Sequence, residues 1–559
     1  MKAYVFGEIR PSSVQAVLDE YNEGEPILGM MVKMKGGDKL VIGRVVGCSR
    51  SSDLVKEYIQ AKQISQSKDL PPTQELLKHM EGTILEIELI TAFQDNKRVP
   101  LNFLLKPLSE VHLLDEIPIP ESPYKGYLGY LWGTTNKYPL ILQDFQTLKE
   151  AYHFFITGQS GSGKSTLTQM LLALYNNRNP NMNFLILDTV GEFTASFQGD
   201  DKIFLPLKDI WKGTVEIYTP PKDLVLEGWD VFKEVCINYE VLNTLGIPTN
   251  STDNVKRGIN AIVDILIESV VKRTKHTSTR YMSPELVEET FKQLEKDDAT
   301  LEKDFVNKIY NTKESRDRLK ETIKDSRTFQ KFINELKEIA ELFYTDDGKK
   351  KTIPDIIDDF SRSVVNGHPG RCVVLNFTLH IAHDSSSGLR SKYVRETLRS
   401  LYSAGIDLYN TRGDINLNTL VVLEEAHRYA PRYTEIEEER KLSNEIVKYY
   451  IETRKFGIGW ACITTRPSNV RREIFENSRV KIIGMGLING PDADLLKETF
   501  DKGFYEIYKL FPDPTDTLSS KKEICFAIHG PITTLSRQTP EFITVFNTKE
   551  EFLESNKWQ

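Results

Sequence analysis

The sequence lacks several features that define large classes of protein. It has only five cysteines among 559 residues, an odd number without a C-x-x-C pair, which argues against a disulfide framework and the common zinc motifs. His380 and His383 lie near Asp384, but no further ligand stands at zinc spacing. No apolar stretch approaches membrane-spanning length, and the first residues do not form a signal peptide. We therefore expect reduced, mostly buried thiols in a cytoplasmic protein with no membrane partner.

A strong charge bias is also missing. The net charge is −8, from 72 basic and 80 acidic residues, and this argues only mildly against a nucleic-acid binder. A ring that threads DNA needs positive charge only along its channel. The hydrophobic content of 40% and charged content of 27% are those of an ordinary globular protein, and the length predicts more than one domain. Composition therefore leaves the function open.

What the sequence does contain is a complete phosphate-binding loop, GQSGSGKST at residues 158–166. An apolar run that predicts a strand precedes the loop, and a helical pattern follows it, as this motif requires. The glycines let the backbone turn so that its N–H groups point at phosphate oxygens beside a helix N-terminus. Lys164 would neutralise the β- and γ-phosphates, and the Ser165 hydroxyl would bind Mg²⁺. The residues predicted to bind ATP are Gly158, Gly161, Ser162, Gly163, Lys164, Ser165 and Thr166.

A second element, TLVVLEEAH at residues 419–427, is an apolar strand that ends in two acids. Two such acids are by themselves more often a helix start, but the phosphate loop in the same chain favours a Walker B element. Glu424 would then hold Mg²⁺, and Glu425 would orient or deprotonate the attacking water. Adjacent residues of an extended chain point to opposite sides, as these two roles require.

Three further positions have weaker signals. Asp188, in LILDTVGEF, has two interpretations. It is a helix cap or turn residue, or else Asp188 or Glu192 lies beside the phosphates. Thr465 follows a predicted strand, where a polar sensor of the γ-phosphate is expected. Arg454 closes the helical pattern of residues 445–453. It is either a favourable charge at a helix C-terminus or an arginine finger that reaches a neighbouring subunit's γ-phosphate.

The order of predicted elements divides the chain. Residues 1–135 are rich in short apolar runs and predict a small β-barrel or sandwich, with a helix in the polar interval 49–74. From residue 136 to 559, strands alternate with helices, which predicts an α/β domain with a parallel sheet covered on both faces. The predicted strands are 30–34, 40–46, 84–92 and 101–105 in the first region and 154–156, 184–187, 372–376, 420–423 and 461–464 in the second.

Two segments of the second region differ from the rest. Residues 222–345 are charged, periodic and poor in glycine, which predicts a helical insertion. Residues 504–559 predict a β-rich extension that ends in a polar tail. The glycine-containing stretch 484–490 lacks the third glycine and the following helix start of a dinucleotide loop, so it reads as a plain strand–loop connection.

The motifs GQSGSGKST, LILDTVGEF, LVVLEEAHRYAP, ETRKFGIG and TTRPSNV, in this order, resemble those of the HerA family of DNA-translocating ATPases in the HerA–FtsK group. The stretch VIGRVVG is similar to the barrel that precedes the motor in this family. The resemblance implies a RecA-like P-loop core in a homo-hexameric ring around double-stranded DNA, with ATP and Mg²⁺ between subunits. It also implies that Glu424 supports the metal, Glu425 is the catalytic base and Arg454 is a finger acting in trans.

The resemblance further implies a partner protein. HerA proteins work with a NurA-type nuclease in DNA end processing, and related bacterial proteins pair with other effectors, including sirtuin-like NAD hydrolases, in antiphage defence. Two residues depart from the family pattern: Tyr152 replaces a common arginine and Thr465 a common glutamine. They indicate a divergent branch. They also leave open an ATP-stabilised ring scaffold that assembles and activates an effector with little translocation.

The residues that contact DNA are the least visible part of the sequence. Basic runs stand at residues 272–275, 349–351 and 471–472. Such runs are more often solvated faces than channel linings. Channel loops would contact phosphates without reading bases, so we expect sequence-independent, salt-sensitive binding.

Overall fold

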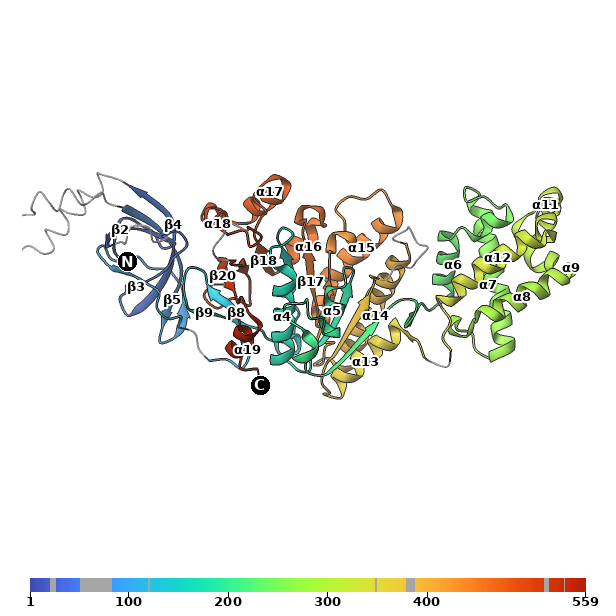
Figure 1. The fold of residues 1–559 in the computed structure, drawn as a ribbon, viewed down its shortest axis with the longest axis horizontal. Helices are drawn as coiled ribbons and strands as arrows, with labels where there is room; N and C mark the ends of the chain where they lie inside the picture. Colours follow the sequence, from blue (N-terminus) through green and yellow to red (C-terminus); the bar gives the residue numbers. More distant parts are fainter. Residues whose placement is uncertain are drawn as a thin grey trace, which may run out of the picture.

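The computed structural model describes residues 1–20, 27–50, 83–118, 121–346, 349–378, 388–516, 522–536 and 538–558. An N-terminal barrel, a central α/β domain and a helical region follow one another along the long axis of the molecule (Figure 1). Residues 51–74 of the predicted helical interval, and the pair His380 and His383, lie outside the described residues.

The N-terminal strands close into a barrel in the order β2-β1-β7-β3-β4-β5, because β2 also pairs with β5. Alternate apolar residues such as Val5, Val41 and Ile87 are fully buried inside it. The strand expected at residues 101–105 is wrong: Pro100 and Pro107 flank an irregular segment there, and proline cannot donate to a ladder. The strands are β1 (Lys2–Ile9), β2 (Ser13–Glu20), β3 (Met31–Gly36), β4 (Lys39–Arg50), β5 (Thr83–Gln94), β6 (Lys97–Val99) and β7 (Glu110–Leu113).

The change from barrel to central domain comes before the expected boundary at residue 135. Strand β8 (Lys125–Leu131) pairs with β9 (Lys137–Ile141) and with β20 (Glu541–Val545), so it belongs to the central sheet. Its apolar pattern resembles that of the barrel strands, and its partner β20 lies at the other end of the chain. A buried ion pair, Arg44 to Glu541 at 3.1 Å, joins the barrel to this sheet.

The central sheet has the order β12-β15-β11-β16-β17-β10-β18-β19-β20-β8-β9, parallel from β12 to β18. Its inner strands are buried on both faces, and this explains their continuous apolar sequences. All five strands predicted for this region are present, and the mixed α/β fold with a parallel sheet and an N-terminal barrel is confirmed. The parallel strands are β10 (Phe154–Thr157), β11 (Asn183–Asp188), β12 (Thr214–Tyr218), β15 (Arg371–Asn376), β16 (Thr419–Leu423), β17 (Ile458–Thr464) and β18 (Val480–Gly484).

Helices cover both faces of this sheet. Alternate residues of one strand enter different apolar layers: Val421 packs with α14 and α15, whereas Val422 packs with α4 and α5. The covering helices are α4 (Lys164–Arg178), α5 (Glu192–Gln198), α13 (Ile353–Val365), α14 (Gly388–Arg412), α15 (Glu437–Glu452) and α16 (Arg472–Asn477).

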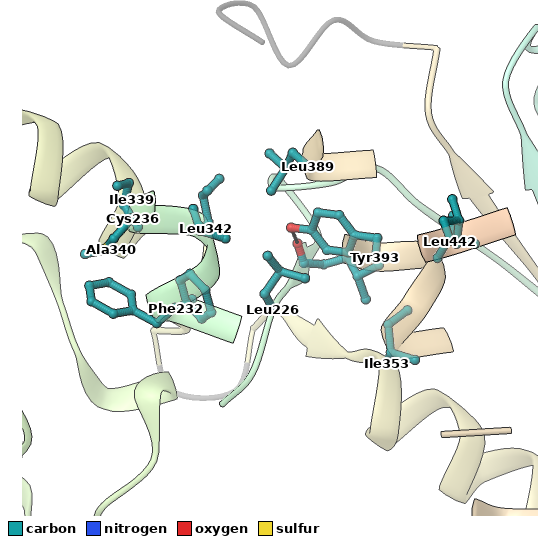
Figure 2. Packing of buried hydrophobic residues seen from close by; sticks show 14 of the residues in the cluster. Leu226, Phe232, Cys236, Ile339, Ala340, Leu342, Ile353, Leu389, Tyr393 and Leu442 are labelled. Atoms are coloured by element: carbon teal, nitrogen blue, oxygen red, sulfur yellow. Dashed lines mark hydrogen bonds between the residues drawn. The ribbon is translucent and has the colours of Figure 1, made fainter. Parts of the chain in front are cut away.

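The helical region leaves the central domain at β13 (Leu224–Val225) and returns at β14 (Lys351–Thr352), which pair in parallel. At this neck, Tyr393 of α14 donates a hydrogen bond to the carbonyl of Leu224 at 3.1 Å, and Leu226 lies between Tyr393 and Phe232 (Figure 2). The main helices of the region are α6 (Trp229–Asn238), α7 (Thr252–Thr274), α8 (Pro284–Lys296), α11 (Lys313–Lys324) and α12 (Ser326–Glu341).

The C-terminal segment adds two antiparallel strands to the central sheet, β19 (Cys525–His529) and β20. The expected polar tail contains a helix, α19 (Lys549–Ser555), because Thr548 caps it and Phe552 is fully buried beneath it. The thiols of Cys236, Cys372, Cys462 and Cys525 are buried, as expected, and Cys48 is exposed. Within the described ranges, no helix is long and apolar enough to cross a bilayer.

Candidate functional site

The phosphate-binding loop connects β10, which lies between β17 and β18, to the N-terminus of α4. Gly158 and Gly163 both have positive φ, 154° and 83°. A Cβ on Gly158 would stand 2.6 Å from Ser162 Oγ, and one on Gly163 would stand 2.7 Å from the side chain of Ile524. Only glycine fits this turn, so the loop adopts the anion-binding shape that its sequence predicts.

Lys164 lies inside this loop. Its Nζ donates a hydrogen bond to the carbonyl of Gln159 at 2.9 Å, and the residue is 8% exposed. Burial lowers the pKa of Lys164, and the charges of Glu425 and Glu192 oppose that shift. The Ser162 hydroxyl is buried and has no hydrogen-bond partner among the described residues. A phosphate oxygen would satisfy both groups.

Glu424 follows β16 and is buried beside Asp188, which ends β11. Its Oε2 accepts a hydrogen bond from the Val190 N–H at 3.2 Å. Burial, followed by the hydrogen bond and charge of Asp188, raises the pKa of Glu424 to about 10. Asp188 itself accepts hydrogen bonds from the N–H groups of Gly191 (2.6 Å) and Thr194 (2.7 Å), so its geometry is that of a cap for α5.

Glu425 has the left-handed backbone conformation, with φ 53°, which is uncommon outside glycine and favoured at functional sites. His427 Nδ1 lies 3.2 Å from Glu425 Oε2 and 3.2 Å from the Thr464 hydroxyl at the tip of β17. The first contact is an ion-pair distance without good hydrogen-bond orientation, since Oε2 has no hydrogen-bond partner in the described chain. His427 lowers the pKa of Glu425, and Arg428 and Lys164 add to this shift. The surroundings of Glu425 therefore favour its ionised form, close to the phosphate loop.

A third carboxylate, Glu192 at the start of α5, also faces Lys164. Its Oε2 is buried with no hydrogen-bond partner among the placed residues, and its charge acts on both Lys164 and Glu424. Carboxylate and hydroxyl oxygens are the ligands that Mg²⁺ prefers. The described residues contain no group of three or more His, Cys, Asp or Glu that could hold a metal alone. Ser165 and Glu424 are the residues that would hold Mg²⁺ here, together with nucleotide phosphates.

The other two predicted residues lie at different ends of β17. Thr465 follows the strand next to the phosphate loop, because Thr464 pairs in register with Thr157. Arg454 precedes the strand, where it forms an ion pair with Glu150. The seven residues of β17 span roughly 20 Å. The structure therefore gathers Lys164, Ser165, Glu424, Glu425 and Thr465 at the edge where the parallel strands end, here called the carboxyl edge, and places Arg454 at the opposite amino edge.

This geometry agrees with the comparisons to known proteins. Residues 148–362 match the family model described as the central domain of helicase HerA. The HerA resemblance is confirmed. A probable DNA double-strand break repair helicase HerA of Methanocaldococcus jannaschii is 21% identical over 444 residues, which cover 76% of this chain and 80% of that protein. The P-loop and the two sequence matches together support an ATPase whose sequence is similar to that of HerA.

Solved structures align more loosely. VirB4 of Thermoanaerobacter pseudethanolicus aligns at 12% identity and TM-score 0.37, over 77% of this chain and 99% of that chain. The genome packaging NTPase B204 of Sulfolobus turreted icosahedral virus 2 aligns at 9% identity and TM-score 0.28, over 71% and 98%. The assignment therefore depends on the sequence match and on the site.

Of the two departures from the HerA pattern, Tyr152 lies away from its own nucleotide site. It is buried at the amino edge, and its hydroxyl hydrogen-bonds that of Tyr175 in α4. Thr465, in contrast, lies at the carboxyl edge. Only the second departure can act directly on the ATP that this chain's own P-loop binds.

The three basic runs are largely neutralised within the chain. Arg273 pairs with Glu289, Lys351 with Asp359 and Arg472 with Glu476 and Glu498, which fits the solvated-face interpretation. The stretch 484–490 is a strand–loop connection, but a helix, α17 (Gly490–Thr499), does follow it. The Met485 carbonyl of this loop accepts a hydrogen bond from the Gln159 N–H at 2.9 Å, so the loop supports the P-loop.

Proposed function

We propose that this chain hydrolyses ATP to drive double-stranded DNA through a homo-hexameric ring. The observation that carries the proposal is the convergence of the phosphate loop and the Glu424–Glu425 pair on one edge of the sheet, with Lys164 and Glu425 close enough to shift each other's pKa. Two segments more than 250 residues apart in sequence thereby form one polar, partly buried site. The HerA match supports DNA as the track.

Each side chain has a role that its surroundings support. Lys164 and the loop N–H groups bind the β- and γ-phosphates, and Ser165 with Glu424 would hold Mg²⁺, which neutralises charge on the phosphates. Glu425 is ionised and positioned by His427, so it can accept a proton from the attacking water. Thr465 would donate a hydrogen bond to the γ-phosphate or to that water.

Arg454 is proposed to act on a neighbouring subunit. Its distance from its own P-loop excludes it from that site, and its side chain is 47% exposed beside Glu150. In a ring with head-to-tail interfaces, the amino edge of one subunit can face the carboxyl edge of the next. The guanidinium would then stabilise charge on the transferred phosphoryl group.

The motor is further proposed to serve a partner, as the family resemblance implies. A NurA-like nuclease would make it part of DNA end processing, and another effector, such as a sirtuin-like NAD hydrolase, would make it part of antiphage defence. The alternative is a ring scaffold that binds ATP but translocates little.

Turnover of ATP with and without duplex DNA tests the proposal. We expect hydrolysis that DNA stimulates and that Lys164→Ala abolishes. Slow ATP hydrolysis at the same rate with and without DNA would support the scaffold. DNA-stimulated hydrolysis by Lys164→Ala would contradict an ATPase at this site.

A further inference from the structure

A second polar cavity lies on the carboxyl edge, beyond the acidic pair. Two loops and helix α15 form it: residues 428–436, which follow His427, residues 465–471, which follow β17, and the first half of α15. Pro431 and Val470 form a β-bridge, and the Arg432 N–H donates to the Asn469 carbonyl at 2.7 Å. The Arg471 N–H donates to the Ala430 carbonyl at 3.0 Å. The two loops therefore form one hydrogen-bonded unit.

Three arginines line this cavity, which has a volume of about 440 Å³. Arg471 is paired with Glu473 and also donates to Asn444 at 2.8 Å. For Arg432 and Arg440, the described chain shows no ion pair, and both are exposed. The remaining lining is polar except for one proline: Pro431, Tyr433, Thr434, Glu435, Ser443 and Asn444.

Nearby carboxylates cancel this charge only in part. In the first turn of α15, Glu437 pairs with Lys441 and Glu438 pairs with Lys392 and Lys441, whereas Glu439 accepts a hydrogen bond from Thr434 and keeps its charge. Glu435 is the one acidic residue among those that line the cavity. Three arginines and one carboxylate line the cavity, so its lining carries a net positive charge.

An exposed aromatic ring is part of the cavity lining. Tyr433 is 82% exposed, the highest value among the large hydrophobic residues of the described surface, and the Arg432 guanidinium lies 5.4 Å from the centre of its ring. Guanidinium groups bind phosphate oxygens in a bidentate manner, and a tyrosine hydroxyl can donate to a phosphate or a sugar. This combination fits a phosphodiester chain.

We propose that this arginine cavity, built by Arg432, Arg440 and Arg471 with Tyr433, binds the phosphate backbone of double-stranded DNA. The inference rests on the proposed function and names the surface through which DNA would act. Contacts to the phosphate backbone do not read the edges of the bases, so binding is independent of sequence and weakens with salt.

The same loops are connected by hydrogen bonds to the segments that carry Glu425 and Thr464. The Arg428 N–H donates to the Glu425 carbonyl at 2.8 Å, and the Arg466 N–H donates to the Thr464 hydroxyl at 3.1 Å. Thr464 contacts His427, which contacts Glu425. DNA in the arginine cavity would thus fix the loops that position Glu425, which links DNA binding to ATP turnover.

The test uses the full-length protein with Arg432→Ala and Arg440→Ala combined, and a fluorescent duplex in the presence of a non-hydrolysable ATP analogue. We expect affinity to fall by at least tenfold and the salt-dependence slope to fall by about two, one for each lost cation. Arg432→Lys with Arg440→Lys should recover most of the slope. The matched control is Arg318→Ala with Lys331→Ala, two exposed cations of the helical region, which should change neither quantity.

Different results separate the two proposals. If wild type binds duplex DNA and the arginine double variant binds it with the same affinity and slope, the arginine cavity is refuted while the motor stands. An equal loss in the control pair also refutes it. If wild type does not bind duplex DNA at all, the proposed motor fails as well. A thermal melt and binding of a fluorescent ATP analogue establish that each variant is folded.

Discussion

The two ends of the central sheet have opposite characters. The carboxyl edge gathers Lys164 with three carboxylates, two of which have oxygens that are buried without hydrogen-bond partners within the described chain. At the amino edge, polar groups are satisfied by their own chain: Arg454 by Glu150, and His153 by the Trp460 N–H. The carboxyl edge therefore has buried polar groups that a ligand could satisfy. At the amino edge the polar groups already have partners, and Arg454 is half-exposed.

Under the proposed function, this difference bears on assembly. A single subunit would bind the nucleotide and place the base, whereas Arg454 would have to come from a neighbouring subunit. Hydrolysis would then depend on the ring, as the proposed DNA motor requires.

The largest effect is expected from removing the charges of the carboxyl edge. Lys164→Ala should abolish ATP binding and turnover. Glu425→Gln keeps the shape of the side chain but removes its basicity, so turnover should fall by about 10²–10⁴-fold while ATP still binds. Steady-state hydrolysis and binding of a fluorescent ATP analogue measure the two quantities.

The control for this prediction is Glu476→Gln, the same change on the exposed surface of α16, which should leave turnover unchanged. Full turnover by Glu425→Gln would show that the base lies elsewhere, with Glu192 as the next candidate.

A smaller but still large effect is expected at the amino edge. Arg454→Ala should lower turnover by roughly 10³-fold without weakening ATP binding, because an arginine finger acts on the transition state. Glu150→Gln removes only the partner of Arg454 in a half-exposed pair, so turnover should change little. Wild-type turnover by Arg454→Ala would favour the simpler role of a charge at a helix C-terminus.

The amino edge should also respond to pH through His153. This ring is buried, its centre lies 4.1 Å from that of the tilted Tyr450 ring, and it accepts a hydrogen bond from the Trp460 N–H at 3.2 Å. Burial lowers its pKa to about 3. Since the unfolded chain takes up this proton near pH 6.5, its contribution to stability is complete above that pH and is lost as pH falls towards 3.

His153→Asn removes this titration. Wild type should therefore lose up to about 1 kcal/mol more stability per pH unit than the variant between pH 6 and 4, measured as the shift in urea midpoint. Parallel pH profiles for the two proteins would show that the buried ring does not titrate as described.

The smallest effect is expected at Thr465. Thr465→Ala removes a short donor from the carboxyl edge and should lower kcat only a few-fold, and Thr465→Gln should restore or raise it because the amide reaches further. If Thr465→Ala lowered kcat as much as Glu425→Gln does, Thr465 would be an essential sensor of the γ-phosphate and not a weakened one.

Much of the site could be predicted from the sequence because its residues stand in contiguous motifs. The P-loop, the acidic strand tip and the five strands of the central domain all follow from local patterns. In contrast, β8 pairs with a strand more than 400 residues away, and no local pattern gives that partner. In the irregular segment at 101–105, Leu105 is buried in the barrel core, whereas Leu104 is 59% exposed, so its apolar run does not mark a strand.

The arginine cavity shows the same limit at the level of charge. The sequence offered contiguous basic runs as candidate DNA contacts, yet most of their charges are paired in the fold. Arg432, Arg440 and Arg471 are scattered over two loops and a helix, and only the hydrogen bonds between those loops bring them together. The stretch RYAPRY at residues 428–433 could have pointed to Arg432, and Arg471 stands in the basic run 471–472, but no local pattern indicates Arg440.

The most direct test of the account mixes two inactive variants, Glu425→Gln and Arg454→Ala, before ring assembly. If Glu425 of one subunit works with Arg454 of the next, random mixing at equal amounts gives about a quarter of the interfaces both intact groups, and hydrolysis returns in the mixture. If both groups serve the same subunit's nucleotide, no mixture contains a complete site, and hydrolysis stays as low as in either variant alone.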